Sequence, residues 1–242
     1  GPRRTLGTAT SVRVAVDLIP DQGPRKRSVI CTQVSYRADF LETLWPGAIS
    51  AWVDHHLGMG VDEITLYDLD GTFAQYAARP EVRYIPLVNL AVSGAYGRAW
   101  ALHRRCQKCL EFVVADHCLM SYRHQADWVL GIRSFDQFLL EGNWSLSSLL
   151  RTLDSTGAPG ALINEWDLVP MQGYQYPGRP GTLRELLEEH SCPMLLLTMP
   201  DPIMRPEKVA YWETHRFLVR FEEGGRGSEA WEVPMVFLPP GT

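Results

Sequence analysis

The chain has 242 residues, of which 45% are hydrophobic and 21% are charged, with 23 Lys and Arg side chains against 28 Asp and Glu. This composition excludes intrinsic disorder, collagen and a bare coiled coil, and a chain of this length can bury a sizeable core without disulfides or metals. The net charge of −5 gives no general attraction for polyphosphate, and the only basic cluster is Arg25-Lys26-Arg27, so we expect no nucleic-acid partner.

The N-terminal segment is rich in Pro, Gly and Arg and lacks sustained periodicity, so we expect a lead-in over 1–27 and a core that starts at Ser28. Gly1-Pro2 resembles the scar left by a protease, which leaves room for a natural signal or membrane anchor before it. The longest apolar run, Met194 to Met199, has the length of a strand rather than the roughly 20 residues of a membrane span. We therefore expect the chain itself to be soluble.

Strands and helices alternate in the first half of the chain. Short apolar runs with β-branched residues predict strands at 29–34, 63–67, 82–87 and 126–132. Pro46 is expected in the first turn of a helix that ends at Gly58 and carries an apolar stripe of Ile49, Trp52, Val53, His56 and Leu57. A longer helix is predicted at 100–122. This alternation predicts an α/β fold with a mostly parallel central sheet flanked by helices.

The second half of the chain is less regular. We predict a helix at 146–153, a strand at 161–166, a Gly/Pro-rich loop at 170–181 and a helix at 183–190. No internal repeat and no linker divides the sequence. We therefore expect one domain that extends over 28–242.

The cysteines and a histidine pair do not predict a metal site. Five cysteines, at 31, 106, 109, 118 and 192, are too few and too scattered for a disulfide framework. Cys106-x-x-Cys109 lies in a predicted helix, without the second pair of a structural zinc site or the preceding strand of a thioredoxin-like motif. We favour unreactive buried thiols, with a single disulfide as the alternative. His55 and His56 are expected to pack or cap near a helix end, since nothing nearby completes a zinc site.

Polar residues follow several of the predicted strands. In a mostly parallel sheet, ligands bind at the carboxyl ends of the strands. Tyr36 and Arg37 follow the first strand, and Asp68 and Asp70 follow the second. These four residues are placed to meet the base and ribose of a nucleotide, because acidic side chains at such ends can accept ribose hydroxyls. The segment at 133–136 follows the fourth strand and is the third candidate ligand-binding end.

Three segments carry a family resemblance. The first is AWVDHHLGMGVDEITLYD at 51–68; the second joins ADHCLMSYR at 115–123 to WVLGIRSFDQFL at 128–139; the third is MRPEKV at 204–209, followed by His215. In this order and spacing they resemble segments of glycosyltransferase family 92, once called DUF23. The resemblance covers roughly 28–220 and implies a GT-A fold, with a nucleotide-binding half at about 28–140 and an acceptor-binding half at about 141–242.

The resemblance implies a divalent cation, Mn²⁺ or Mg²⁺, which GT-A enzymes usually hold with an Asp-x-Asp after a core strand to stabilise the leaving diphosphate. The aligned triplet here is Ser134-Phe135-Asp136, so a hydroxyl, which is a poorer ligand, replaces the first carboxylate. The metal is then bound weakly, bound mainly through the diphosphate, or absent. Arg133 can place a permanent cation against the diphosphate, and His215 is the implied second protein ligand beside Asp136.

Transfer with inversion needs a carboxylate that takes the proton of the acceptor hydroxyl, in line with the departing nucleotide. Glu165 is the first candidate and Asp167 the second, because they flank Trp166 at the end of a late strand, where the resemblance implies the acceptor. His117 aligns with a family acid that would face the donor sugar.

These residues predict a glycosyltransferase that moves a sugar from a nucleotide-sugar donor to a glycan or glycoprotein hydroxyl; the resemblance favours a UDP-sugar, with UDP-galactose first. The alternative is a degenerate member that binds a glycan or another partner without transfer, because Ser134, Gln137 and His117 depart from the family pattern. A sugar-phosphate nucleotidyltransferase would need a Gly-rich phosphate loop, which 35–38 is not. The resemblance, with the glycosylation triplet Asn143-Trp144-Ser145, favours the Golgi or secretory lumen and a type II membrane protein.

Overall fold

A computed structural model describes residues 23–44, 46–87, 107–132, 135, 137–139, 145–163, 166–169, 192–195, 201–213 and 216–219. The strands of its first half are β1 (Lys26–Ser35), β2 (Glu63–Asp68), β3 (Val82–Pro86) and β4 (Ala126–Ile132). The later strands are β5 (Gly160–Ile163), β6 (Trp166–Val169), β7 (Cys192–Leu195), β8 (Asp201–Met204), β9 (Val209–Glu213) and β10 (Arg216–Val219). The helices are α1 (Ala38–Leu44), α2 (Ala48–Gly58), the 3₁₀ helix η1 (Ala74–Ala78), α4 (Gln107–Tyr122) and α5 (Leu146–Thr156).

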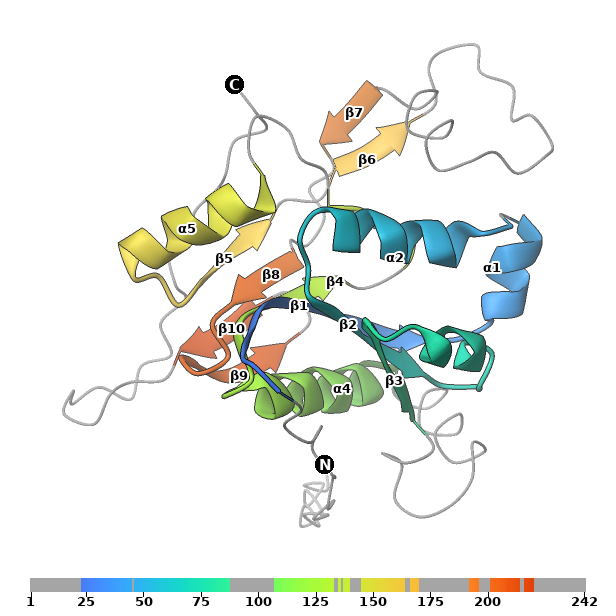
Figure 1. Ribbon diagram of the computed structural model, residues 1–242, viewed down its shortest axis with the longest axis horizontal. Coiled ribbons are helices and arrows are strands. Elements are labelled where there is room, and N and C mark those ends of the chain that lie inside the picture. Colours follow the sequence, from blue (N-terminus) through green and yellow to red (C-terminus); the bar gives the residue numbers. More distant parts are fainter. Residues whose placement is uncertain are drawn as a thin grey trace, which may run out of the picture.

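Six strands form the central sheet, in the order β3-β2-β1-β4-β8-β5 (Figure 1). The neighbours from β3 to β4 are parallel, whereas β8 is antiparallel to both β4 and β5. The register aligns the carboxyl ends of the first three strands, because Ser35 pairs with Asp68 and Asp68 pairs with Pro86. Two further antiparallel pairs, β9 with β10 and β6 with β7, lie outside this sheet.

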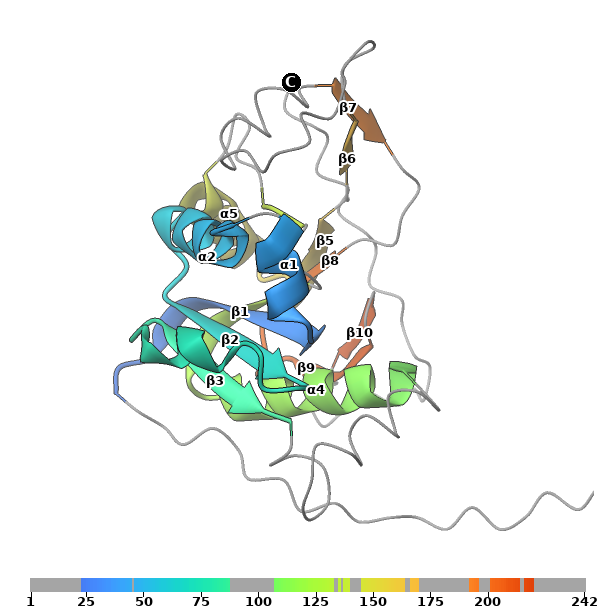
Figure 2. The ribbon, with the colours of Figure 1, turned by 90° about the vertical axis from the view of Figure 1, so that its right-hand side faces the viewer.

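Both faces of the sheet are covered, as the two ribbon views show (Figures 1 and 2). Helices α2 and α5 pack on one face, over a core that includes Ile30 and Leu130. Helix α4 and strand β9 pack on the other face, over a core that includes Val29 and Val129. Successive residues of a strand point to opposite faces, so strands that are buried on both sides appear in the sequence as continuous apolar runs.

The predicted α/β class with a mostly parallel sheet is confirmed. The four parallel strands lie where they were expected, and so do α2, α5 and the described part of the predicted helix at 100–122. Pro46, however, lies outside the helix, since α2 begins at Ala48 after Gly47, whose φ is 80°. The carboxylate of Glu42 accepts the N–H groups of Gly47 and Ile49, at 2.5 and 3.2 Å, and so caps this helix in place of a side chain at its own N-terminus.

Other elements differ from the prediction. Strand β1 begins at Lys26, two residues before the expected start of the core. The basic side chains that suggested a tail form ion pairs with carboxylates: Lys26 with Glu63 at 3.2 Å, and Arg27 with Asp127 at 3.3 Å. The predicted strand at 161–166 is divided between β5 and β6, and neither α1 nor β8 has a counterpart among the predicted elements. The predicted loop at 170–181 and helix at 183–190 lie outside the described residues.

Among the described residues, no helix is both long enough and apolar enough to cross a membrane.

Candidate functional site

The chain connections change direction at the carboxyl edge of the parallel strands. From β1 the chain passes through α1 and α2 to β2, whereas β4, on the other side of β1, follows α4, which covers the opposite face. In open α/β sheets, ligands bind at the carboxyl ends of the strands, where the connections diverge in this way. Thr32 pairs with Ile132, the last residue of β4. Tyr36, Arg37 and the segment at 133–136 therefore follow the two strands that flank this point.

The loop after β1 is held in an uncommon backbone conformation. Arg37 has a φ of 60°, in the left-handed region that residues other than glycine rarely adopt. Its N–H donates to Oδ2 of Asp70 at 2.9 Å, and its guanidinium carbon lies 4.5 Å from the centre of the Phe40 ring. Tyr36 and Phe40 are 40% and 48% exposed. The loop after β1 and the start of α1 therefore expose two aromatic side chains, Tyr36 and Phe40, and the Arg37 guanidinium lies over one of them.

Asp70 and Thr72 tie the loop after β2 to the loop after β1. Oδ1 of Asp70 accepts the Thr72 hydroxyl at 2.7 Å, and the oxygen of that hydroxyl accepts the N–H of Ala38 at 2.8 Å. Burial alone would raise the pKa of the Asp70 carboxyl, but the hydrogen bonds from Thr72 and from the Arg37 N–H outweigh burial and lower it. Asp70 therefore sets the spacing of the two loops as an ionised group, and its contact with a ribose stays a prediction.

Asp68 organises the turn that follows β2. Its side chain is fully buried. Oδ1 accepts the N–H groups of Asp70 and Gly71 at 3.0 and 2.9 Å, and Oδ2 accepts the N–H of Phe73 at 3.0 Å and the hydroxyl of Tyr84 at 2.8 Å. Burial raises the pKa of Asp68, and these four hydrogen bonds oppose that rise. The structure gives Asp68 a role in the turn, and its predicted ribose contact remains untested.

On the other face, α4 is joined to the sheet by buried polar contacts. His117 is 4% exposed, and its Nδ1 lies 2.8 Å from the Tyr67 hydroxyl. Its predicted contact with the donor sugar stays a prediction. The hydroxyl of Tyr122, the last residue of α4, forms hydrogen bonds with two side chains of β2: the Thr65 hydroxyl, at 2.6 Å, and the Glu63 carboxylate.

A disulfide joins the same helix to the sheet. Cys31 of β1 and Cys118 of α4 are bonded, although 87 residues separate them. The favoured expectation of unreactive thiols is therefore wrong for these two cysteines, which form a bridge, as the alternative allowed. Spacing along the chain hides this pair, because only the packing of α4 on β1 brings the two residues together.

The segment after β4 is fixed to α2 by three hydrogen bonds. Nε1 of Trp52 donates to the carbonyl of Gln137 at 2.7 Å. Leu139 is held at both of its backbone groups: its N–H donates to Nε2 of His56 at 3.2 Å, and its carbonyl lies 2.7 Å from Nε2 of His55. The expectation that the two histidines pack near the helix end is confirmed. Their hydrogen bonds to the backbone of Leu139, more than 80 residues away, could not be predicted from the sequence.

Aromatic packing fixes the same segment at a second place. Phe135, the middle residue of the Ser-Phe-Asp triplet, is 8% exposed. Its ring centre lies 4.9 Å from that of Trp52, edge to face, and 5.1 Å from that of Phe73, stacked. Since Phe73 belongs to the turn that Asp68 organises, the loops after β2 and β4 are in contact through this ring.

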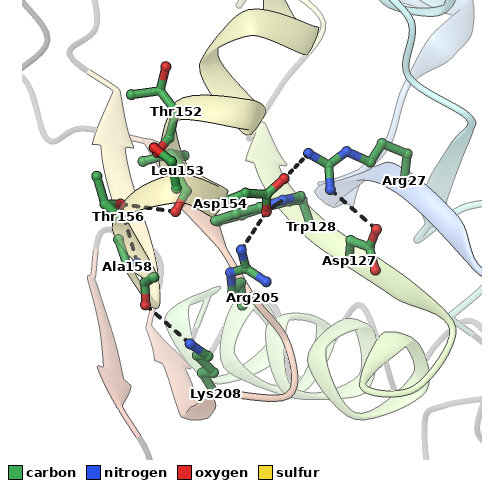
Figure 3. Close-up of polar contacts among 12 residues, drawn as sticks. Arg27, Asp127, Trp128, Thr152, Leu153, Asp154, Thr156, Ala158, Arg205 and Lys208 are labelled. Carbon is green, nitrogen blue, oxygen red and sulfur yellow. Dashed lines mark hydrogen bonds and ion pairs between the residues drawn. The ribbon is translucent and has the colours of Figure 1, made fainter.

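Arg205, from the third segment quoted for the family resemblance, makes its contacts at the opposite end of the sheet, where the parallel strands begin. Asp154 of α5 lies between two arginines, accepting from Arg27 of β1 and from Arg205, which follows β8 (Figure 3). The guanidinium of Arg205 lies over the Trp128 ring of β4, 4.5 Å from its centre, and Nε1 of Trp128 donates to Asp154 at 3.2 Å. Burial opposes ionisation of Asp154, but Arg27 and Arg205 outweigh it and lower its pKa. This ion-pair cluster fastens β8 and α5 to the parallel strands.

Several predicted site residues lie outside the described part of the chain: Glu165, Arg133, Ser134, Asp136 and His215. Asp167 lies in β6, of which only the backbone is described. Among the residues that are described, no three His, Cys, Asp or Glu side chains form a group that could hold a metal ion. The catalytic and metal roles of these residues therefore stay predictions.

No family model and no curated protein matches the chain. Among solved structures, it is similar to the bifunctional IspDF from Campylobacter jejuni, with a TM-score of 0.35 and 9% identity over 76% of this chain and 42% of that one. It is also similar to the 4-diphosphocytidyl-2C-methyl-D-erythritol synthase from Anaerococcus prevotii, with a TM-score of 0.35 and 10% identity over 76% of this chain and 72% of that one. Similarity at this level carries no information about substrate or reaction.

Proposed function

We propose that this protein is a GT-A glycosyltransferase that moves a sugar from a nucleotide-sugar donor, a UDP-sugar in the first instance, to a hydroxyl of a glycan or glycoprotein. The observation that carries the proposal is that the second of the three segments quoted for the family resemblance contacts both of the others. Trp52 of the first segment packs on Phe135 of the second, and Arg205 of the third lies over Trp128 of the second. The second segment thus contacts each of the other two, which supports the proposal that the three form one site region.

The carboxyl edge supports a nucleotide as the ligand. Tyr36 and Phe40 are partly exposed aromatic side chains, on which a base can stack, and Arg37, which lies over the Phe40 ring, offers a permanent cation for a phosphate. All three follow β1, which flanks the point where the chain connections diverge. The segment at 133–136 follows β4 on the other flank, so Arg133 and Asp136 are our candidates for contact with the diphosphate.

The proposed reaction is an in-line displacement with inversion. A carboxylate, Glu165 first and Asp167 second, takes the proton of the acceptor hydroxyl. The acceptor oxygen forms a bond to the anomeric carbon while the bond from that carbon to the diphosphate oxygen breaks, and the nucleoside diphosphate leaves with the bonding electrons. Mn²⁺ or Mg²⁺, held by Asp136 and His215 in this proposal, would offset the charge on the diphosphate.

A titration and a transfer assay test the proposal. We expect calorimetry to detect UDP binding that Mn²⁺ strengthens, and a screen of UDP-sugars to detect transfer or donor hydrolysis. Asp136→Asn should lower the rate of transfer by about 100-fold, the loss seen when one group that stabilises the developing charge is removed. Asp39→Asn, which removes an exposed carboxylate of α1, is the matched control and should leave the rate unchanged.

Two results would contradict different parts of the proposal. If no nucleotide sugar binds or reacts, the protein is not a glycosyltransferase. Binding of a glycan without any affinity for UDP would then favour the degenerate, non-catalytic alternative. If Asp136→Asn transfers sugar at the normal rate, the enzyme assignment stands and the site assignment fails.

A further inference from the structure

The end of α2 holds an unusual pair of contacts. His55 and His56 are adjacent in the chain, and their rings are perpendicular, with centres 5.0 Å apart. Adjacent residues of a helix normally point in directions about 100° apart, yet both rings reach the same residue, Leu139. His55 bonds the carbonyl of Leu139 and His56 bonds its N–H. In a sheet, a neighbouring strand would bond these two backbone groups.

The hydrogen-bond partners fix the donor or acceptor role of three ring nitrogens. Nδ1 of His56 lies 2.8 Å from the carbonyl of Trp52 and must donate, because a carbonyl only accepts. Nε2 of the neutral ring is then the acceptor that the Leu139 N–H requires. Nε2 of His55 must in turn donate to the Leu139 carbonyl. Each ring nitrogen in this chain of contacts therefore has one defined role.

Ring packing supports the same segment between its hydrogen bonds. The Phe138 ring stacks on His56, with centres 6.0 Å apart and planes 7° apart, and meets His55 edge to face at 5.5 Å. Phe135 is packed on Trp52. The described residues between 135 and 139 are thus anchored at Phe135, Gln137, Phe138 and Leu139, every anchor reaching α2.

We propose that Trp52, His55 and His56 are positioning residues for the transfer reaction, which act by setting the place of the segment 135–139. The inference rests on the proposed function, because Asp136 is joined by one peptide bond each to Phe135 and Gln137, two of the anchored residues. A group that must meet a diphosphate has to be held to a fraction of an ångström, and contacts one layer away from the ligand commonly supply that precision. None of the three side chains is expected to touch the substrate.

A matched pair of variants at His55 tests the inference. His55→Gln keeps an N–H donor at about the distance of Nε2, whereas His55→Leu has a similar size and no donor. His55 is only half-buried, so both changes should be compatible with folding. If His55→Leu does not fold, His55→Asn replaces it, since its shorter side chain retains polarity but falls short of the Leu139 carbonyl.

Three quantities are measured for each variant: hydrogen exchange of the peptide covering 135–139, the affinity for UDP with Mn²⁺, and kcat and KM for transfer, all well below the melting temperature. We expect exchange in His55→Leu to be about tenfold faster and kcat about tenfold lower, the factor for one hydrogen bond. His55→Gln should be close to wild type in both. KM for the acceptor should not change in either variant.

The outcomes separate the inference from the proposed function. If wild-type protein neither binds UDP nor transfers a sugar, the proposed function fails and the inference fails with it. If wild-type protein is active and His55→Leu shows faster exchange with an unchanged kcat, the contacts are structural only and the inference alone is overturned. It is also overturned if exchange is unchanged in His55→Leu, or if His55→Gln loses as much activity as His55→Leu.

Discussion

The two faces of the central sheet use buried polar groups in different ways. On the face covered by α4, side chains of the helix bond side chains of β2, and the Cys31–Cys118 disulfide joins the helix to β1. On the face covered by α2, side chains of the helix bond backbone groups of a loop, at Gln137 and Leu139. The first arrangement fixes a helix to a sheet, and the second fixes a loop that follows β4, at the carboxyl edge of the parallel strands.

This difference suggests that the contacts on the two faces of the sheet have different roles. Contacts on the α4 face should contribute to stability with little effect on ligand binding, whereas contacts on the α2 face should affect both. Glu63 illustrates the first kind. Burial opposes its ionisation, but hydrogen bonds from Arg83 and Tyr122 outweigh burial and lower its pKa. It lies at the start of β2, away from the carboxyl edge.

The largest expected effect on the free energy of unfolding comes from removing the disulfide on the α4 face. Replacing both Cys31 and Cys118 by Ala removes a bridge between residues 87 apart, and loop-closure entropy predicts a loss of about 4.6 kcal/mol in the free energy of unfolding. Denaturant unfolding measures this loss, and UDP affinity should be unchanged. Reduced wild-type protein is the control and should match the variant. Alkylation of both cysteines in unreduced wild-type protein would contradict the prediction.

A smaller effect on the same face concerns Gly131 of β4. The indole of Trp212 lies against Gly131 so closely that a methyl group there would overlap it. Gly131→Ala should lower the free energy of unfolding by about 2 kcal/mol, the usual size for an over-packed core. Gly58→Ala is the control, because a methyl group at Gly58 meets no atom and Ala favours the helix. Equal stabilities of the two variants in denaturant would show that Trp212 moves away freely.

The regular part of the fold could be predicted from the sequence. Strands such as 126–132 are buried on both faces and therefore form continuous apolar runs, and the stripe of α2 repeats at helical spacing. Strand β8 escapes prediction because Asp201–Met204 is short and contains a proline, and its place in the sheet depends on pairing with distant strands. The sequence also could not predict that the strand expected at 161–166 is two strands, β5 and β6. Strand β6 pairs with β7 and not with the main sheet, and this pairing depends on residues distant in the chain.

The candidate site could be located from the sequence but its contacts could not. The rule that ligands bind at carboxyl strand ends selects Tyr36, Arg37 and Asp70, which the structure brings to one edge. It also selects Asp68, although four internal donors occupy that carboxylate. Nothing in the spacing of His55 and His56 indicates a partner more than 80 residues away, because side-chain bonds to a loop backbone leave no periodic pattern.

The smallest expected effect is a pH dependence of the free energy of unfolding. We assign it to His56, which lies on the α2 face of the sheet. Burial lowers the pKa of His56 from 6.5 to about 3; the hydrogen bond to Trp52 opposes this shift, and the nearby His55 adds to it. Below pH 6.5 the unfolded chain therefore binds a proton that the folded protein excludes, so stability is lost as the pH falls. Between pH 7 and 5.5 the free energy of unfolding should decrease by about 1 kcal/mol.

This window separates His56 from the carboxylates whose pKa values are lowered. Glu63, Asp70 and Asp154 have lowered pKa values, so their contribution to stability is complete above about pH 4.5 and is lost only at lower pH. His56→Gln, which keeps an acceptor for the Leu139 N–H but does not titrate, should remove the decrease between pH 7 and 5.5. The Cys31→Ala, Cys118→Ala protein should retain it, because the disulfide lies on the other face. A decrease of the same size in His56→Gln would mean that another group titrates in this range, and the assignment of the pH dependence to the α2 face would then be wrong.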